Sequence, residues 1–149
     1  MIIYITSVLH AVIIGCGRVG SAVAKQLAAD GWDVTCVDED ENALARLGAW
    51  KGGFVVGHGM DADILEEAGA TDAEAAVVST DGDNSNIVIG QILQRRYGIG
   101  CVVVRVLDPA RAEFYARLGL RTVCPTQTAI STLTDAVRAC EAPVPQVTT

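Results

Sequence analysis

Short β-branched, apolar runs alternate with segments of helical periodicity along almost the whole chain, and this alternation restricts the fold more than any other feature. The runs recur about every 20 to 26 residues, and several (AVII, AAVV, CVVV) are almost continuously apolar, as in strands buried on both faces. Strands separated by helices are typical of βαβ units and a parallel sheet. We therefore predict an α/β fold with strands at 11–15, 33–37, 53–56, 75–79, 101–105 and 122–124.

The segments between the predicted strands show the periodicity of amphipathic helices. In the first, an apolar stripe is formed by Val19, Ala22, Val23 and Leu27. In a later helix, NIVIGQILQRRY, the residues expected to point inward are Ile87, Val88, Ile92 and Leu93. Such helices cover both faces of a parallel sheet, so we predict a doubly wound (Rossmann) sheet with the strand order 3-2-1-4-5-6.

A last helix is predicted at about 126–140, after the sixth strand. Its apolar stripe of Ile130, Leu133 and Val137 has no further strand to cover. This face therefore has to pack either on the chain's own sheet or on another subunit. We divide the chain into a nucleotide-binding domain at 10–125 and a crossover or dimerisation helix with its tail at 126–149, where EAPVPQVTT has the composition of a linker.

The composition indicates one domain with a sizeable core and argues against two classes of partner. The chain has 149 residues, of which 50% are hydrophobic. Its formal net charge is -7, from 18 acidic and 11 basic residues, which disfavours a general nucleic-acid or anionic-membrane surface. The opening MIIYITSVL is too short to span a membrane and lacks the flanks of a signal peptide. It is either an extra edge strand or an extension upstream of the natural start.

The cysteines predict neither disulfides nor a metal site. None of them forms a CxxC pair, and their odd number and wide spacing argue against a disulfide framework and against zinc. We expect small, buried thiols in a reducing cytoplasm for Cys16, Cys36, Cys101, Cys124 and Cys140.

A glycine-rich turn follows the first predicted strand. Gly15, Gly17 and Gly20 form G-x-G-x-x-G between that strand and the first helix. In such a turn the first glycine permits the bend, the second lets a pyrophosphate approach the backbone, and the third lets helix and strand pack closely. The helix N-terminus offers N–H groups to a phosphate, and Arg18 adds a full positive charge. Cys16 also lies in the turn, with its side chain expected to pack rather than to react.

An acidic residue closes the second predicted strand. Asp38 follows Gly20 by 18 residues, where a carboxylate can accept both ribose hydroxyls of a nucleotide and repel the 2′-phosphate of NADP. The alternative is a tight turn followed by an ordinary exposed aspartate.

Two further polar segments end strands at the same predicted edge. Ser79, Thr80 and Asp81 follow the fourth strand and should border the same crevice as the glycine-rich turn. The alternative for this segment is capping of the next helix by Asp83 or Asn84. In the segment after the third strand, GHGMDAD, the histidine could touch the adenosine half of a ligand, and the alternative is a plain loop before a helix.

The sequence shows no catalytic arrangement. It has no Ser-His-Asp or Cys-His order, no metal-ligand spacing and no recognisable substrate domain after the Rossmann unit. We therefore predict binding without turnover, and no enzyme. Two alternatives stay open: the cofactor domain of an NAD-dependent oxidoreductase, and a dimerisation module whose crevice is empty.

Four segments taken together resemble the N-terminal lobe of RCK (KTN, or TrkA N-terminal) domains, and most of all the actinobacterial type. They are HAVIIGCGRVGSAVAKQL, VDED, GHGMDADILEEAGATDAEAAVVSTDGDNSNI and VVVRVLDPARAEFYARLGLRTVCPT. Such domains are cytoplasmic regulatory subunits of Trk/Ktr potassium uptake systems. The resemblance implies binding of NAD(H), ATP or ADP, dimers that assemble into a ring against the inner face of the cell membrane, and nucleotide-dependent gating of a membrane potassium channel or transporter.

The resemblance also assigns roles to residues. It implies that Gly15, Gly17, Arg18 and Val19 hold phosphates, that Asp38 and Glu39 hold the ribose, that His58, Gly59 and Met60 border the adenine, and that Ser79 and Thr80 lie at the middle of the nucleotide. Two features depart from the family pattern. Thr126 stands where some members have a cation-binding glutamate, so we expect no metal there, and the C-terminal lobe of full-length members does not follow.

Overall fold

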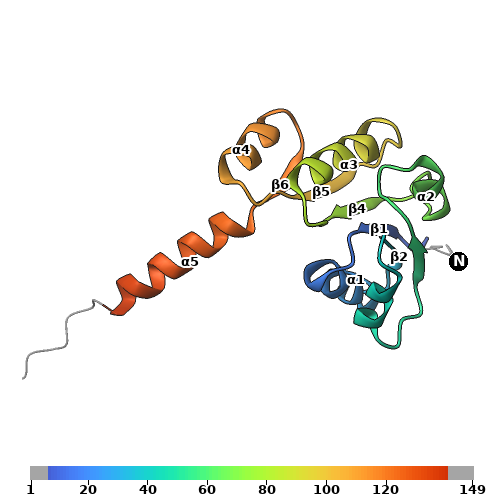
Figure 1. Cartoon of the computed structure of the whole chain (residues 1–149), viewed down its shortest axis with the longest axis horizontal. Coiled ribbons are helices and arrows are strands. Elements are labelled where there is room, and N and C mark those ends of the chain that lie inside the picture. The colour runs from blue at the N-terminus through green and yellow to red at the C-terminus, as the bar shows by residue number, and fades with distance from the viewer. Residues whose placement is uncertain (1–6, 141–149) are drawn as a thin grey trace, which may run out of the picture.

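The structure, a computed structural model, describes residues 7–140 and shows a single six-stranded sheet (Figure 1). Every neighbouring pair of strands is parallel, and the order is β3-β2-β1-β4-β5-β6. The predicted doubly wound topology is thereby confirmed. The strands are β1 (His10–Ile14), β2 (Asp33–Asp38), β3 (Gly53–Val56), β4 (Ala75–Val78), β5 (Cys101–Arg105) and β6 (Arg121–Val123).

Helices cover the sheet on both faces and divide the core into two clusters. On one face, β1 and β2 pack against the first helix and the 3₁₀ helix. On the other, the sheet packs against the three helices that follow β3, β4 and β5. The helical elements are α1 (Arg18–Ala29), η1 (Glu41–Leu47), α2 (Ala62–Glu67), α3 (Asp83–Arg95), α4 (Pro109–Arg117) and α5 (Pro125–Cys140).

The inward faces predicted for α1 and α3 are confirmed for most of their residues and wrong for one valine in each helix. In α1 the buried residues are Gly20, Ser21 and Ala24, whereas Val19 is 45% exposed. The prediction that Val88 of α3 points inward is also wrong, since this side chain is 42% exposed. α3 lies closest to β5 at Gly90, where an added Cβ would collide with the side chain of Val104. The other large residues of both predicted stripes pack on the core: Val23 and Leu27 of α1, and Ile87, Ile92 and Leu93 of α3.

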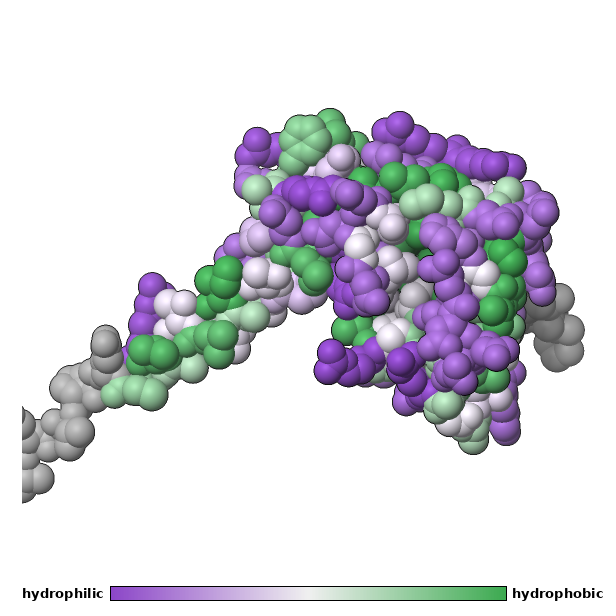
Figure 2. All heavy atoms as spheres, in the orientation of Figure 1, coloured by the Kyte–Doolittle hydropathy of each residue, from purple (hydrophilic) through white to green (hydrophobic). Residues whose placement is uncertain are grey.

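The last helix, α5, extends away from the sheet as an arm (Figure 1). None of its 16 residues is buried. Ile130, Leu133 and Val137 are 50%, 68% and 62% exposed, and hydrophobic side chains are visible along the arm in Figure 2. The sequence left two possibilities for this face, packing on the chain's own sheet or on another subunit. The first is wrong, because the sheet does not cover the face. Nothing in the structure tests the predicted domain boundaries at 125 and 126.

The five cysteines are all free, but they are not all buried. Cys16 and Cys36 lie in the core, whereas Cys101 and Cys124 are partly exposed. Cys140 is exposed because it lies on α5, which has no core to join, so the prediction of a buried thiol is wrong there. The proposed edge strand or extension at the start falls largely on residues 1–6, and the linker on 141–149, both outside the described part.

None of the helices in the described part of the chain has the length and the apolar character needed to span a membrane. Within residues 7–140 there is also no cluster of His, Cys, Asp and Glu side chains that could hold a metal ion.

Candidate functional site

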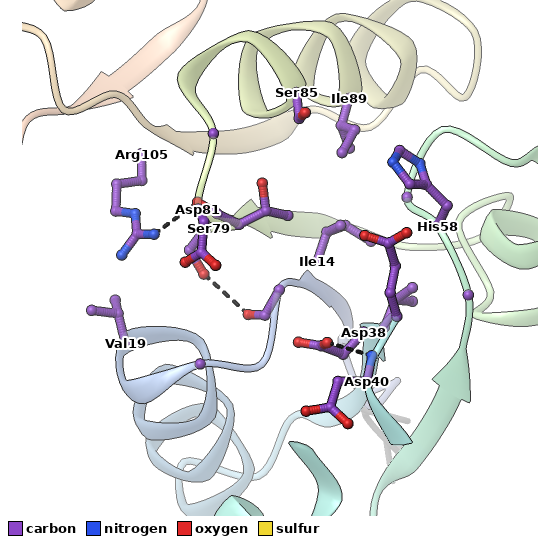
Figure 3. Close-up of a pocket in the computed structure, with 18 of the residues that line it drawn as sticks. Ile14, Val19, Asp38, Asp40, His58, Ser79, Asp81, Ser85, Ile89 and Arg105 are labelled. Carbon is purple, nitrogen blue, oxygen red and sulfur yellow. Dashed lines mark hydrogen bonds between the residues drawn. The ribbon is translucent and has the colours of Figure 1, made fainter. Parts of the chain in front are cut away.

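A cavity of about 700 Å³ opens at the carboxyl ends of the central strands, where the order of the sheet reverses between β1 and β4 (Figure 3). Ligands of doubly wound sheets bind at this switch point. The wall on the β1 side, which we call the turn wall, consists of the glycine-rich turn, the start of α1 and the end of β2. The wall on the β4 side, which we call the loop wall, consists of the 79–82 loop, the start of α3 and the end of β5.

Two glycines bring the two walls into contact. Gly15 has φ of +90°, and a Cβ at this residue would lie 2.7 Å from the backbone nitrogen of Thr80. A Cβ at Gly20 would overlap the carbonyl oxygen of Gly15 and lie 2.9 Å from Oγ of Ser79. Neither position can carry a side chain without moving backbone. In the native turn the Ser79 hydroxyl donates to the Gly15 carbonyl at 3.2 Å, which joins β4 to the turn.

The N-terminus of α1 faces the cavity without a side-chain cap. Gly17 occupies the N-cap position and the first turn contains no acidic residue. Ser21 N–H donates to the Gly17 carbonyl, so the N–H groups before it have no partner within the helix. Arg18, which is exposed, and Val19 line the cavity beside them. Uncapped N–H groups, the positive end of the helix dipole and a guanidinium together form a site for an anion.

The carboxylate of Asp38 lines the cavity and is held in place by two backbone groups. Its Oδ2 accepts from Cys16 N–H at 2.7 Å, and its Oδ1 accepts from Asp40 N–H at 2.9 Å. Because an ionised carboxylate has about four acceptor positions, two remain for hydroxyl groups of a ligand. Glu39, Asp40 and Arg46 line the same end of the cavity.

On the loop wall, one buried amide holds the loop in shape. Asn86 is 1% exposed, and its Oδ1 accepts from Thr80 N–H at 2.9 Å and from the Thr80 hydroxyl. Its Nδ2 donates to the carbonyls of Thr80 and Arg105, each at 3.0 Å. The amide is thereby fully satisfied.

Arg105, the last residue of β5, adds a third arginine to the cavity lining, besides Arg18 and Arg46. Its Nη2 donates to the Thr80 carbonyl at 2.7 Å, and its side chain lies beside the 79–81 loop in Figure 3. The buried Nε has no hydrogen-bond partner, and Arg105 forms no ion pair with the described residues. A partly buried guanidinium without a counter-ion favours an anionic ligand.

His58 lies on the far side of the cavity, after β3 (Figure 3). Its Nδ1 is 3.1 Å from Met60 N–H, which can only donate. The ring nitrogen therefore accepts, and the proton of the neutral imidazole is on Nε2.

The structure brings together most of the residues that the sequence selected. Three of them do not line the cavity: Cys16, Gly20 and Met60. The predicted residues that do line it are Gly15, Gly17, Arg18, Val19, Asp38, Glu39, His58, Gly59, Ser79, Thr80 and Asp81.

Sequence reasoning missed nine lining residues, of which Arg105 has the most distinct chemistry. A charged residue that ends an otherwise apolar strand was the available signal for it. The prediction that Asp83 or Asn84 caps α3 is wrong, because Gly82 is the N-cap and no side chain caps it. The missed residues are Ile14, Val37, Asp40, Arg46, Gly57, Gly82, Ser85, Ile89 and Arg105.

Cys16 packs in the core beneath the turn, as expected from the sequence. The hydrogen bond between the Cys16 and Cys36 thiols lowers the pKa of Cys16 and raises that of Cys36. Burial opposes the first shift and adds to the second. Both side chains are fully buried, so they act as packing groups beneath the turn.

These features define a Rossmann-like domain with a nucleotide-binding geometry at its switch point. The family model of the TrkA-N domain matches residues 11–126. The chain therefore belongs to the TrkA-N domain family, which confirms the resemblance seen in the sequence.

Three known proteins show the extent of the similarity. The Trk system potassium uptake protein TrkA of Streptomyces coelicolor is 46% identical over 116 residues, which are 77% of this chain and 52% of that protein. The Kef CTD of Shewanella denitrificans in its AMP-bound form has a TM-score of 0.75 at 25% identity and covers 89% of this chain and 82% of its own. The GsuK structure bound to ADP has a TM-score of 0.76 at 21% identity, over 89% of this chain and 35% of its own, and supports the fold.

The chain spans about half the length of the curated relative from Streptomyces. That relative's name describes a potassium uptake protein rather than a catalyst, in agreement with the prediction that the chain is not an enzyme.

Proposed function

We propose that the cavity binds an adenine nucleotide, one of AMP, ADP, ATP or NAD(H), as a signal that is not consumed. The observation that carries the proposal is the pairing of an uncapped helix N-terminus with a fixed carboxylate across one cavity. The α1 N-terminus, Arg18 and Arg105 supply positive charge for phosphates, and Asp38 supplies acceptors for ribose hydroxyls. The AMP-bound state of the similar Kef domain agrees with this ligand class.

The orientation follows from the charges. Phosphates lie at the start of α1, between the turn wall and Arg105, while the adenosine half lies over the end of β2 beside Asp38 and Glu39. In this orientation we propose that His58, which lines the cavity, donates its Nε2–H to a nitrogen of the adenine. Asp38 excludes an extra phosphate on the ribose, so the proposal favours NAD over NADP.

Native mass spectrometry tests the proposal without prior choice of ligand. The protein is unfolded, stripped of small molecules, refolded and mixed with equal concentrations of AMP, ADP, ATP, NAD, NADP and GDP. We expect adducts of one adenine nucleotide per chain and weaker adducts of NADP and GDP. Equal adducts of all six, or none, would contradict a specific adenine site.

We further propose that the chain is part of a cytoplasmic regulatory subunit, peripheral to the membrane, that controls a membrane potassium channel or transporter. The support is the membership of the TrkA-N family and the name of the Streptomyces relative. Comparison of potassium uptake by cells with and without the gene, at low external potassium, tests this step. Unchanged uptake, with the protein present in the parent strain, would contradict it.

A second copy of the chain is the partner that we propose for α5. Its stripe of Ile130, Leu133 and Val137 is exposed, and the polar face opposite carries the ion pair of Asp135 and Arg138. Two such stripes related by a two-fold axis bury each other, and two dimers or more can close into a ring. Light scattering should show dimers for the wild type and for Asp135→Asn, and monomers for Leu133→Asp. A wild type that stays monomeric at every concentration would contradict this assembly.

A further inference from the structure

The loop wall of the cavity is hydrogen-bonded to the segment that leads from β5 into α4, and this segment is bonded in turn to the root of α5. Two routes run in parallel: the first through the buried side chain of Asn86 and backbone, the second through the partly exposed side chains of Asp83 and Cys124. Neither depends on an exposed ion pair, which would contribute little.

The first route passes through Asn86. This amide holds Thr80, which lines the cavity, and donates to the carbonyl of Arg105 at 3.0 Å. The same peptide unit continues through the N–H of Val106, which donates to the Val123 carbonyl at 3.0 Å. Val123 is the last residue of β6, two positions before α5 begins. A displacement of the Thr80 loop therefore acts on the end of β6 through one side chain and one peptide.

The second route passes through Asp83, in the first turn of α3. Its Oδ1 accepts from Leu107 N–H at 2.7 Å and its Oδ2 accepts from Asp108 N–H at 3.0 Å. On the other side of the same segment, the Leu107 carbonyl accepts from the Cys124 thiol at 3.5 Å. Cys124 immediately precedes α5, and its own carbonyl accepts from Thr128 N–H in the first turn of that helix.

We propose that the 105–108 segment, held by Asn86 and Asp83, transmits nucleotide occupancy of the cavity to the orientation of α5. This inference rests on the proposed nucleotide site. The phosphate end of the ligand contacts Arg105 and the Thr80 loop, so it acts on the first route at two points, Thr80 and Arg105. Asp83 does not line the cavity and is a positioning residue, which couples the two sites without touching the ligand.

The coupling is tested by NMR on the full chain labelled with ¹⁵N and titrated with ADP. In the wild type, ADP should shift the amide signals of the cavity (Gly17, Thr80) and also those of the root of α5 (Cys124, Thr126, Gln127). In Asp83→Ala the cavity shifts should persist, with the ADP affinity within about threefold of wild type, while the shifts at the root fall at least threefold. Asp83→Asn, which keeps one acceptor without the charge, should restore part of the loss.

Asp61→Ala is the matched control. Asp61 is likewise an aspartate at the start of a helix, as the N-cap of α2, where it accepts from Asp63 N–H, but it has no bond to the 105–108 segment. This variant should behave as wild type at both the cavity and the root. If Asp83→Ala does not fold, Asp83→Asn carries the test, with an intermediate loss at the root.

The outcomes separate the two proposals. Cavity shifts without root shifts in the wild type overturn the coupling, and root shifts that survive in Asp83→Ala overturn the role of Asp83 in it. Both results leave the nucleotide site standing. The absence of cavity shifts in the wild type overturns the nucleotide site, and the coupling with it.

Discussion

The two walls of the cavity are built by different means. The turn wall is shaped by backbone: glycines without room for a Cβ, free N–H groups at the start of α1, and a carboxylate held by main-chain donors. The loop wall is shaped by side chains, above all the buried amide of Asn86 and the guanidinium of Arg105. Under the proposed function, the turn wall is a fixed receptor for phosphate and the loop wall reports on its occupancy, because the side chains of the loop wall also bond to neighbouring elements.

The largest effect is expected for Gly20→Ala on the turn wall. The added methyl group would overlap the Gly15 carbonyl, so helix and turn must separate, which should cost about 3 kcal/mol of unfolding free energy. Urea denaturation followed by circular dichroism measures the loss. Gly17→Ala is the control, since a Cβ there meets nothing within 4 Å and should cost below about 1 kcal/mol. Equal losses would contradict the close approach at Gly20.

The next effect is expected for Asn86→Ala on the loop wall. The change removes the hydrogen-bond partner of Thr80 N–H and of the Arg105 carbonyl, while the Thr80 carbonyl keeps its bond from Arg105, and the loss should cost about 2 to 3 kcal/mol of unfolding free energy. Asn84→Ala, on the same helix turn, removes only an exposed contact with Arg111 and should cost about 0.5 kcal/mol or less. The same denaturation assay applies. Similar values for the two variants would show that the buried amide does not hold the loop.

Arg105→Gln should affect the ligand more than the fold. It removes a positive charge that has no counter-ion among the described residues, so ADP affinity should fall about tenfold or more, with little change for adenosine. Titration calorimetry with the two ligands measures the difference. Arg121→Gln, on β6 and outside the cavity lining, is the control and should leave both affinities unchanged. A parallel loss for ADP and adenosine would argue against a phosphate contact.

The smallest effect is expected for Asp38→Asn. An amide keeps one acceptor for its backbone partners but does not repel phosphate, so the preference for NAD over NADP should narrow by about tenfold or less. Competition between the two dinucleotides measures the ratio. Asp30→Asn, at the exposed C-cap of α1, is the control. An unchanged preference would show that Asp38 does not face the ribose.

The two walls also differ in how far they could be predicted. The strand order and the turn wall followed from the sequence, because glycine spacing and a strand-ending acid have local causes that are visible in it. On the loop wall the prediction covered the segment 79–81 but missed the roles of Asn86 and Arg105, since these two residues acquire them only when β5 lies beside β4. Asp83 was misread for the same reason: its carboxylate bonds to a segment about 25 residues away rather than to its own helix. The inward prediction for α3 was right for Ile87, Ile92 and Leu93 and wrong for Val88, because Gly90 rather than Val88 lies against β5.

The central claim is that the start of α1 and the acid at the end of β2 bind one adenine nucleotide between them. Titration calorimetry of the refolded, ligand-free chain with ADP, adenosine and pyrophosphate tests it most directly. The account predicts one ADP per chain with a dissociation constant well below about 1 mM, and weaker binding of either fragment alone. No ADP binding below about 1 mM, or pyrophosphate binding as tight as ADP, would contradict it.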